Sequence, residues 1–252
     1  MIPIYKPFLQ GNEVKYVNDC LESTWISSRG NYIEKFENAV RDFVGCKYTS
    51  SCSSGTTALD LVFKALKIGS GDEVITSNFT YVASTNAILA NGAKPIFVDI
   101  ETDTWNINPD LIEIKITPNT KAILISNIYG VMPNIDKLNE ICTKHNIYLI
   151  EDAAESLGAE YKGVKSGNIG TISTFSFFGN KTITTGEGGM VLTNNESLYD
   201  KIELLKNQGN SKIKKYYHDV LGFNYRMTNI QAAIGLAQIE QIDKILEIKS
   251  KI

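Results

Sequence analysis

The chain has 252 residues, of which 43% are hydrophobic and 21% are charged, and this composition excludes a disordered polypeptide and suits one large domain or two smaller ones. The 25 Lys and Arg residues against 28 Asp and Glu residues give a formal net charge of −3, which argues against nucleic acid or an anionic membrane as a partner. Because the sequence has no signal-peptide pattern and no apolar run of about 18 residues, we expect a cytoplasmic protein. The four cysteines form no CxxC pair, so neither a metal site nor a disulfide framework is predicted.

Helical and extended patterns alternate along most of the chain. The predicted helices cover residues 12–22, 31–44, 55–67 and 196–207. The predicted strands cover residues 47–51, 72–76, 94–99, 120–126, 147–151, 171–177 and 189–194. In the third helix Leu59, Phe63 and Leu66 share one apolar face. This order predicts an α/β fold with a largely parallel sheet between helices.

The last segment has the pattern of a helix that runs to the end of the chain. Thr228 can cap its N-terminus, and isoleucines and alanines recur along it. We expect one long helix over residues 228–252, which leads from a domain over residues 1–227 toward a C-terminal domain that is absent from this sequence.

A small polar stretch between a strand and a helix predicts an anion site. Ser53-Ser-Gly-Thr-Thr57 would present backbone N–H groups and hydroxyls at a helix N-terminus, where phosphate binds well. The alternative is an ordinary Ser/Thr cap with a permissive glycine.

An aspartate and a lysine add chemistry to this prediction. Asp152 follows a buried strand, at the sheet edge where open α/β folds bind ligands. Lys181 lies in a Gly- and Thr-rich loop, and on its own either residue could be a solvated side chain. Together with a phosphate cradle they are the parts that hold pyridoxal phosphate (PLP), with Lys181 as the Schiff-base lysine and Asp152 on the pyridine nitrogen.

Five stretches carry a family resemblance. They are SGTTAL (54–59), NFTYVA (78–83), EDAAESLG (151–158), TFSFFGNK (174–181) with TTGEGG (184–189), and GFNYRMT (222–228). The sequence resembles the DegT/DnrJ/EryC1/StrS family of nucleotide-sugar aminotransferases from about residue 4 to the C-terminus. The resemblance implies the large domain of a fold type I PLP enzyme, with a mostly parallel mixed sheet, and a homodimer with shared active sites.

The resemblance also implies roles for single residues. Lys181 would bind the cofactor covalently and act as general acid/base, and Asp152 would keep the pyridine nitrogen protonated. Tyr81 would stack on the cofactor ring, although core packing is an alternative for it. Residues that would contact the phosphate are Ser54, Gly55, Thr56, Ser176 and, from the neighbouring subunit, Asn224.

Four polar residues have weaker assignments. Glu155 would approach the phenolic oxygen of the cofactor, where a carboxylate repels a phenolate unless one of them holds a proton. His218 and Arg226 could contact the sugar nucleotide, but a solvated face or an interface salt bridge is an alternative for each. Glu187, which lies between glycines, could simply shape the turn.

The expected reaction transfers an amino group from L-glutamate to C4 of a nucleotide-linked 4-keto-6-deoxy sugar. Within the family, the sequence of this chain favours GDP-4-keto-6-deoxy-D-mannose as the substrate. A dTDP- or UDP-linked 4-keto-6-deoxyglucose is an alternative substrate. A related sugar 3-dehydratase is disfavoured because it would carry histidine in place of Lys181. A truncated, non-catalytic PLP-binding remnant is the third alternative.

Overall fold

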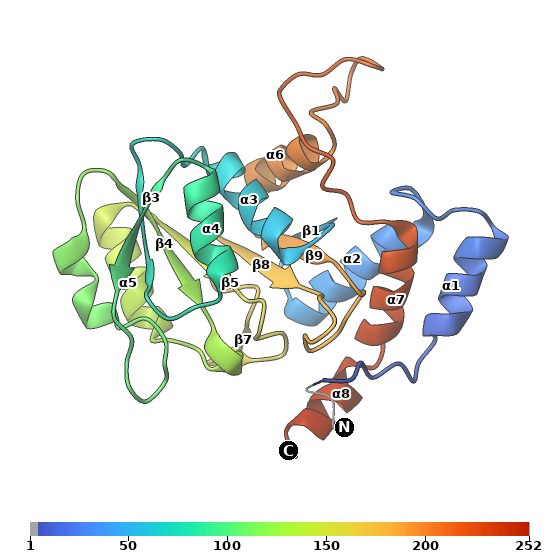
Figure 1. Ribbon diagram of the computed structural model, residues 1–252, viewed down its shortest axis with the longest axis horizontal. Helices are drawn as coiled ribbons and strands as arrows, with labels where there is room; N and C mark the ends of the chain where they lie inside the picture. The colour runs from blue at the N-terminus through green and yellow to red at the C-terminus, as the bar shows by residue number, and fades with distance from the viewer. Residues whose placement is uncertain (1–4, 252) are drawn as a thin grey trace.

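The computed structural model describes residues 5–251, and its centre is a seven-stranded sheet with the order β1-β9-β8-β5-β4-β2-β3 (Figure 1). Its strands are β1 (Tyr48–Cys52), β2 (Glu73–Ser77), β3 (Lys94–Val98), β4 (Thr120–Ser126), β5 (Tyr148–Asp152), β8 (Ile172–Ser176) and β9 (Gly189–Thr193). The β9 strand pairs antiparallel with both β1 and β8, and the other pairs are parallel. The predicted mostly parallel mixed sheet is confirmed.

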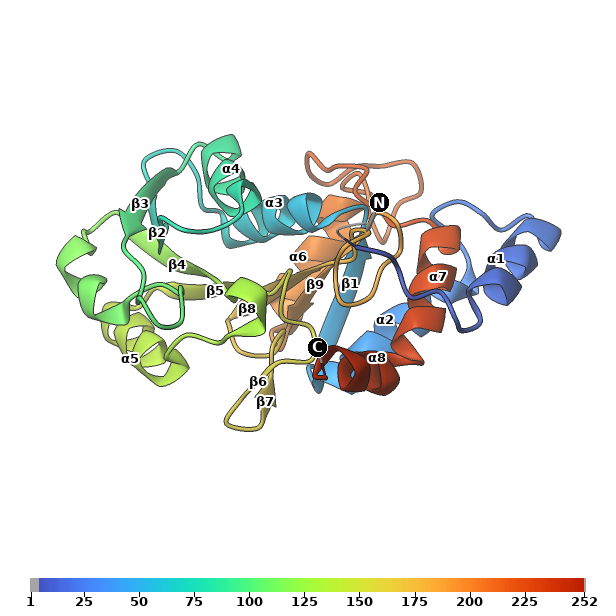
Figure 2. The ribbon, with the colours of Figure 1, turned by 60° about the horizontal axis from the view of Figure 1, so that its bottom comes forward.

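Helices cover both faces of the sheet (Figures 1 and 2). The described helices are α1 (Glu13–Glu22), α2 (Asn31–Val44), α3 (Gly55–Leu66), α4 (Val82–Ala90), α5 (Ile135–His145), α6 (Glu196–Lys206), α7 (Asn229–Ile239) and α8 (Ile242–Lys249). Of these, α1 packs on α7 and not on the sheet (Figure 1). Side chains alternate along the strands, so in β9 Val191 packs under α3 and α6 while Met190 and Leu192 pack under α2 and α7. The sheet is therefore the middle of three layers.

The α2 and α7 helices pack closely because a large side chain on one helix faces a glycine on the other. The buried face of α2 repeats every four residues at Tyr32, Phe36, Val40 and Val44, the spacing of one helix face. On α7, a Cβ at Gly235 would lie 2.7 Å from the Phe36 ring. The glycine therefore leaves the space that the ring fills.

The single C-terminal helix predicted from Thr228 is wrong, because the segment forms two helices that meet at Glu240. The start is confirmed: the Thr228 hydroxyl accepts a hydrogen bond from the Gln231 N–H at 3.3 Å, and the Gln231 side chain accepts one from the Thr228 N–H at 2.9 Å. At the break, the Glu240 carboxylate accepts a hydrogen bond from the Tyr16 hydroxyl at 2.9 Å. The turn lets Ile242 and Ile245 of α8 reach the core, which a straight helix would have carried away from it.

Two further features lie outside the layers. Strands β6 (Glu160–Tyr161) and β7 (Val164–Lys165) form a small hairpin, and the segment 208–225 rises above the body of the molecule (Figure 1). Within residues 5–251, no helix combines the length and the apolar character needed to cross a membrane.

Candidate functional site

Most of the predicted site residues surround one cavity of about 330 Å³. The cavity lies at the carboxyl edge of the sheet, where β5 and β8 end and α3 begins, which is the edge where ligands of open α/β sheets bind. The predicted residues that line it are Ser54, Gly55, Thr56, Tyr81, Asp152, Glu155, Ser176 and Lys181. Residues far apart in sequence therefore meet because the strands that carry them are neighbours.

The N-terminus of α3 forms one wall of the cavity. The Ser54 hydroxyl caps the helix by accepting a hydrogen bond from the Thr57 N–H at 3.1 Å, so the alternative reading of this stretch as a Ser/Thr cap is correct for Ser54. The N–H groups of Gly55 and Thr56 belong to the first helical turn, which offers them no acceptor within the helix. A Cβ at Gly55 would lie 2.8 Å from Cβ of Ser176, so only glycine lets the helix start approach β8 this closely.

Asp152 ends β5 and is buried, with 8% of the residue exposed. Its Oδ2 accepts a hydrogen bond from the Ser84 hydroxyl at 2.5 Å, and its Oδ1 accepts one from the Ala154 N–H at 3.2 Å. Burial raises the pKa of Asp152 above 3.8, while these hydrogen bonds and the charge of Lys181 act in the opposite direction. A cation placed against this carboxylate would favour its ionised form.

Lys181 lines the same cavity from the loop between β8 and β9. Its Nζ lies 3.6 Å from Oε1 of Glu155, and its side chain is 17% exposed. The other Glu155 oxygen accepts a hydrogen bond from the Tyr129 N–H at 3.0 Å. Glu155 therefore faces an ammonium group on one side and a backbone donor on the other, which compensates its negative charge.

Tyr81 and Glu187 lie at the wall of the cavity. Tyr81 precedes α4 and is 73% exposed, so the alternative of core packing is wrong and its ring is free to contact a ligand. Glu187 shapes the turn through its backbone carbonyl, which accepts hydrogen bonds from the Thr185 hydroxyl and the Gln231 amide, each at 2.7 Å.

Sequence reasoning missed the buried polar network beneath the site. Glu151, which precedes Asp152, is fully buried and accepts hydrogen bonds from Asn127 at 2.8 Å and from the hydroxyls of Ser166 and Ser173 at 2.9 and 2.7 Å. The available signal was a carboxylate directly after the apolar residues Leu149 and Ile150 of the strand, because a buried carboxylate requires partners. The Asn127 Oδ1 has no hydrogen-bond partner among the described residues.

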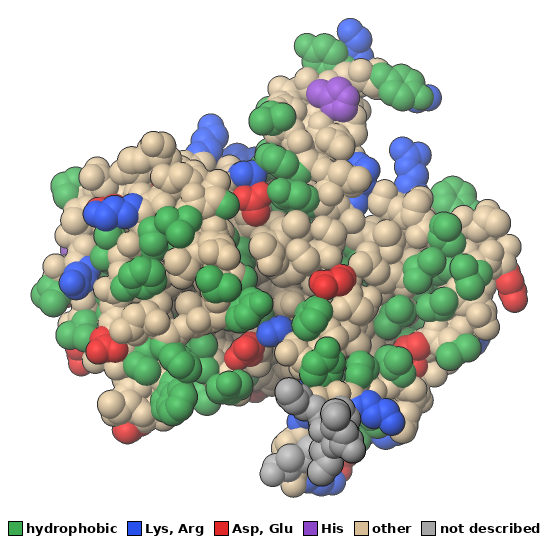
Figure 3. All heavy atoms as spheres, viewed as in Figure 1, with side chains coloured by type: hydrophobic (Ala, Val, Ile, Leu, Met, Phe, Trp, Pro, Cys, Tyr) green, Lys and Arg blue, Asp and Glu red, His purple; other side chains and the backbone are tan. Residues whose placement is uncertain are grey.

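Three predicted residues lie outside this cavity, on the segment between α6 and α7. Asn224 is exposed and bridges to Asn207, and the Nδ1 atom of His218 lies 2.7 Å from the Gln208 carbonyl oxygen. Arg226 lines a second cavity. In the space-filling view the raised segment carries hydrophobic and basic side chains at its tip (Figure 3). The structure therefore does not bring these residues to the lysine of the same chain.

Comparison with known proteins gives consistent matches over the whole chain. The sequence model of the DegT/DnrJ/EryC1/StrS aminotransferase family matches residues 7–252. A GDP-perosamine synthase of Escherichia coli O157:H7 is 53% identical over 251 residues, and one of Vibrio cholerae is 50% identical over 252 residues. Each alignment covers 100% of this chain and 69% of the relative.

Solved structures agree with this match. A Streptococcus pneumoniae protein whose structure was determined in its PLP form superposes with a TM-score of 0.94 at 31% identity. The superposition covers 99% of this chain and 69% of that chain. The chain therefore corresponds to about two thirds of the length of these proteins.

Proposed function

Because the chain belongs to the DegT/DnrJ/EryC1/StrS aminotransferase family, whose members use PLP, we propose that it transfers an amino group from L-glutamate to C4 of GDP-4-keto-6-deoxy-D-mannose, giving GDP-perosamine. The observation that carries the chemistry is the meeting of Lys181, Asp152 and the α3 N-terminus in one cavity. The identities of 53% and 50% with two GDP-perosamine synthases support the choice of substrate.

The residues around the cavity suit both the phosphate and the ring of PLP. The first turn of α3 offers unpaired N–H groups and a positive helix end to a phosphate. The close contact of Gly55 with Ser176 brings the start of α3 and the end of β8 together at the wall of the cavity. Asp152 is buried where ionisation is costly, so a protonated ring nitrogen beside it would compensate its negative charge. The Lys181 amine lies close to Glu155 in the same cavity.

The proposed reaction divides its tasks among these residues. PLP, when bound, supplies an aldehyde for amine exchange and a ring that accepts an electron pair. Asp152 would hold the proton on the ring nitrogen through its charge, and Ser84 and the Ala154 N–H keep that carboxylate in place. Lys181 would take the Cα proton of L-glutamate as a neutral amine, and in its protonated form it would later deliver a proton to C4 of the sugar.

We further propose a homodimer in which Asn224 of one subunit completes the phosphate site of the other. Its exposed position outside the cavity of its own chain supports a contact in trans. The same raised segment exposes large apolar side chains, with Ile213 at 98%, Tyr216 at 88% and Leu221 at 84%. A neighbouring subunit would remove them from water. The cytoplasmic location expected from the sequence stays a prediction.

Two measurements on the purified, PLP-supplemented protein test the proposal. An absorbance spectrum should show a cofactor band that shifts when L-glutamate is added. Product analysis should then show GDP-perosamine from GDP-4-keto-6-deoxy-D-mannose. Turnover only of dTDP- or UDP-4-keto-6-deoxyglucose would reject the substrate assignment, and a spectrum that never responds to L-glutamate would indicate a non-catalytic remnant.

A further inference from the structure

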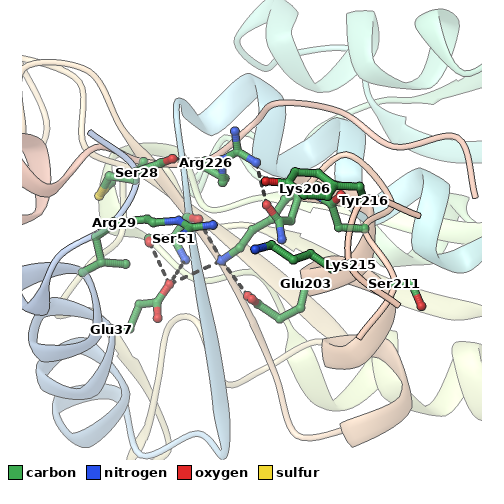
Figure 4. A pocket seen from close by; sticks show the side chains of 14 residues that line it. Ser28, Arg29, Glu37, Ser51, Glu203, Lys206, Ser211, Lys215, Tyr216 and Arg226 are labelled. Atoms are coloured by element: carbon green, nitrogen blue, oxygen red, sulfur yellow. Dashed lines mark hydrogen bonds and ion pairs between the residues drawn. The ribbon is translucent and has the colours of Figure 1, made fainter. Parts of the chain in front are cut away.

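Lys206, the last residue of α6, is the only buried lysine within residues 5–251. Its amine lies 2.6 Å from Glu203 and 3.5 Å from Glu37 of α2, and it donates a hydrogen bond to the Ser50 hydroxyl at 2.8 Å. The two carboxylates approach the amine from two sides (Figure 4). This charge cluster therefore fastens the end of α6 to α2 and to β1, and the proposed chemistry leaves it unexplained.

The amine of Lys206 stays charged although it is buried. Burial lowers its pKa, but the charges of Glu37 and Glu203 outweigh this effect, so the pKa is raised above its ordinary value. Glu37 also accepts hydrogen bonds from the Ser51 N–H and hydroxyl, each at 2.7 Å. Removing such charges from water is costly, and apolar side chains could fill the same space. What the cluster offers instead is a set of directional contacts, which fix the position of the elements that it joins.

The end of α6 holds the segment that carries Asn224. The Leu205 carbonyl oxygen accepts a hydrogen bond from the Phe223 N–H at 2.7 Å. The Lys206 carbonyl oxygen accepts one from the Tyr225 N–H at 3.1 Å. Both residues next to Asn224 are therefore bonded to the helix end that the charge cluster anchors.

Two further contacts fix the same segment. The Arg226 guanidinium donates a hydrogen bond to Asn207 Oδ1 at 2.5 Å. The Tyr225 carbonyl oxygen accepts one from the Ser53 N–H at 2.8 Å. Asn224 itself is exposed. It therefore stands at the surface on a backbone that is held on both sides.

We propose that Lys206 is a positioning residue, which acts through the backbone of residues 223–226 to place Asn224 at the phosphate site of the neighbouring subunit. The inference rests on the proposed function, in which the Asn224 amide contacts the PLP phosphate in trans. Loss of the Lys206 side chain would release the end of α6 from α2 and β1, so that Asn224 could shift. The path from Lys206 to Asn224 lies within one chain, whereas the affected PLP site belongs to the other subunit.

PLP affinity tests whether Lys206 acts through Asn224. We expect Asn224→Ala to weaken PLP binding roughly 10-fold, the usual effect of losing one charge-assisted contact, and Lys206→Met to weaken it roughly 3- to 10-fold. The double variant should bind PLP within roughly 2-fold of Asn224→Ala, because both changes remove the same contact. Additive losses, or a Lys206→Met protein with the affinity of the parent, would overturn the proposal.

A control variant separates positioning from a general loss of charge. Lys212→Met removes a cation on the raised segment whose partner, Asp200, is exposed, so it should bind PLP within roughly 2-fold of the parent. An equal loss of affinity in Lys206→Met and Lys212→Met would contradict the positioning role.

A milder variant keeps the test decisive if Lys206→Met does not fold. Glu203→Gln leaves Lys206 paired with Glu37, so the fold should persist while PLP affinity falls in the same direction. This loss should disappear when Glu203→Gln is combined with Asn224→Ala. A loss that persists in the combined variant would overturn the proposal.

Mixed dimers test whether Lys206 acts on the site of the other subunit. Lys181→Ala subunits cannot bind PLP covalently, so the absorbance band of lysine-bound PLP reports only the site that retains Lys181. In a dimer of one Lys206→Met and one Lys181→Ala subunit, that site receives Asn224 from the subunit with an intact Lys206. It should bind PLP with the affinity of the parent, and a weakened site would show that Lys206 acts within its own chain.

PLP affinity is measured without turnover, which keeps this inference distinct from the proposed function. A parent protein that binds PLP but does not respond to L-glutamate would count against the proposed function alone.

Discussion

Two consecutive carboxylates of β5 face different surroundings. Glu151 turns into the protein and is surrounded by donors, whereas Asp152 lies at the wall of the cavity with the Ser84 hydroxyl and the Ala154 N–H as its partners. The alternation of side chains along a strand separates them. One carboxylate can therefore stabilise the sheet while the other remains available to a ligand.

Lys181 should be the residue that binds PLP covalently. After reduction of the PLP-loaded protein with borohydride, peptide mapping should find the pyridoxyl group on Lys181. Lys206 is the internal control, because its side chain is more deeply buried than that of Lys181 and is held by two carboxylates. A label on Lys206, on another lysine or on none would show that the assignment is wrong.

Replacing Asp152 with asparagine should separate cofactor binding from catalysis. The Asp152→Asn protein should still bind PLP, but its half-reaction with L-glutamate should slow some 30- to 1000-fold, because losing one charge-assisted contact costs about 2 to 4 kcal/mol of transition-state stabilisation. Single-turnover absorbance measurements give this rate. A rate close to that of the parent would exclude the role of Asp152 at the ring nitrogen.

In the cofactor-free chain, the difference in stability between Asp152→Asn and the parent protein should depend on pH. Because burial raises the pKa of Asp152 above its unfolded value near 3.8, its contribution to stability is present below that value and is lost as the pH rises through the folded pKa. Asparagine does not titrate. Urea denaturation should therefore show Asp152→Asn gaining stability relative to the parent between acidic and neutral pH, and a constant difference would contradict the raised pKa.

Glu151 links three elements of the fold. Its carboxylate accepts a hydrogen bond from Ser173, which joins β5 to β8, and others from Ser166 and the Gly167 N–H at 3.1 Å, which join β5 to the turn after β7. Glu151→Gln would place an amide N–H₂ among groups that all donate. We expect a loss of about 2 to 3 kcal/mol in the free energy of unfolding, measured by urea denaturation. Glu160→Gln, an exposed position on β6, is the matched control and should change stability little.

The sequence predicted the elements that have strong local signals. The bounds of α2 agree with the prediction, and every predicted strand is present within one or two residues, because hydrophobic periodicity and caps act locally. The break at Glu240 was not predictable in this way, because the residues that contact Glu240 there, Tyr16 and Asn12, lie far earlier in the chain. No glycine or proline marks it.

The sequence likewise predicted some residues of the candidate site but not the contacts between them. Asp152 and Lys181 could be found because strand ends and glycine-rich loops show in the sequence. Glu155 could also be found, but its pairing with Lys181 and the hydrogen bond from Ser84 to Asp152 depend on how the chain folds.

The position of Asn224 indicates how two copies of the chain would assemble. Asn224 is exposed on the raised segment and does not line the cavity of its own chain, so an Asn224→Ala subunit should damage the phosphate site of its partner. In a homodimer each site would then need Lys181 from one subunit and Asn224 from the other. A two-fold axis makes both sites equal.

Mixing two inactive variants tests this arrangement. In a heterodimer of Asn224→Ala and Lys181→Ala subunits, one site carries both defects and the other carries neither, so about half of the dimers formed at random should regain one intact site. Single-turnover amplitude with L-glutamate measures the intact sites, and light scattering with differently tagged subunits verifies exchange. If exchange occurs without any recovery of amplitude, or if the PLP-saturated protein is a monomer, Asn224 acts within its own chain or not at all.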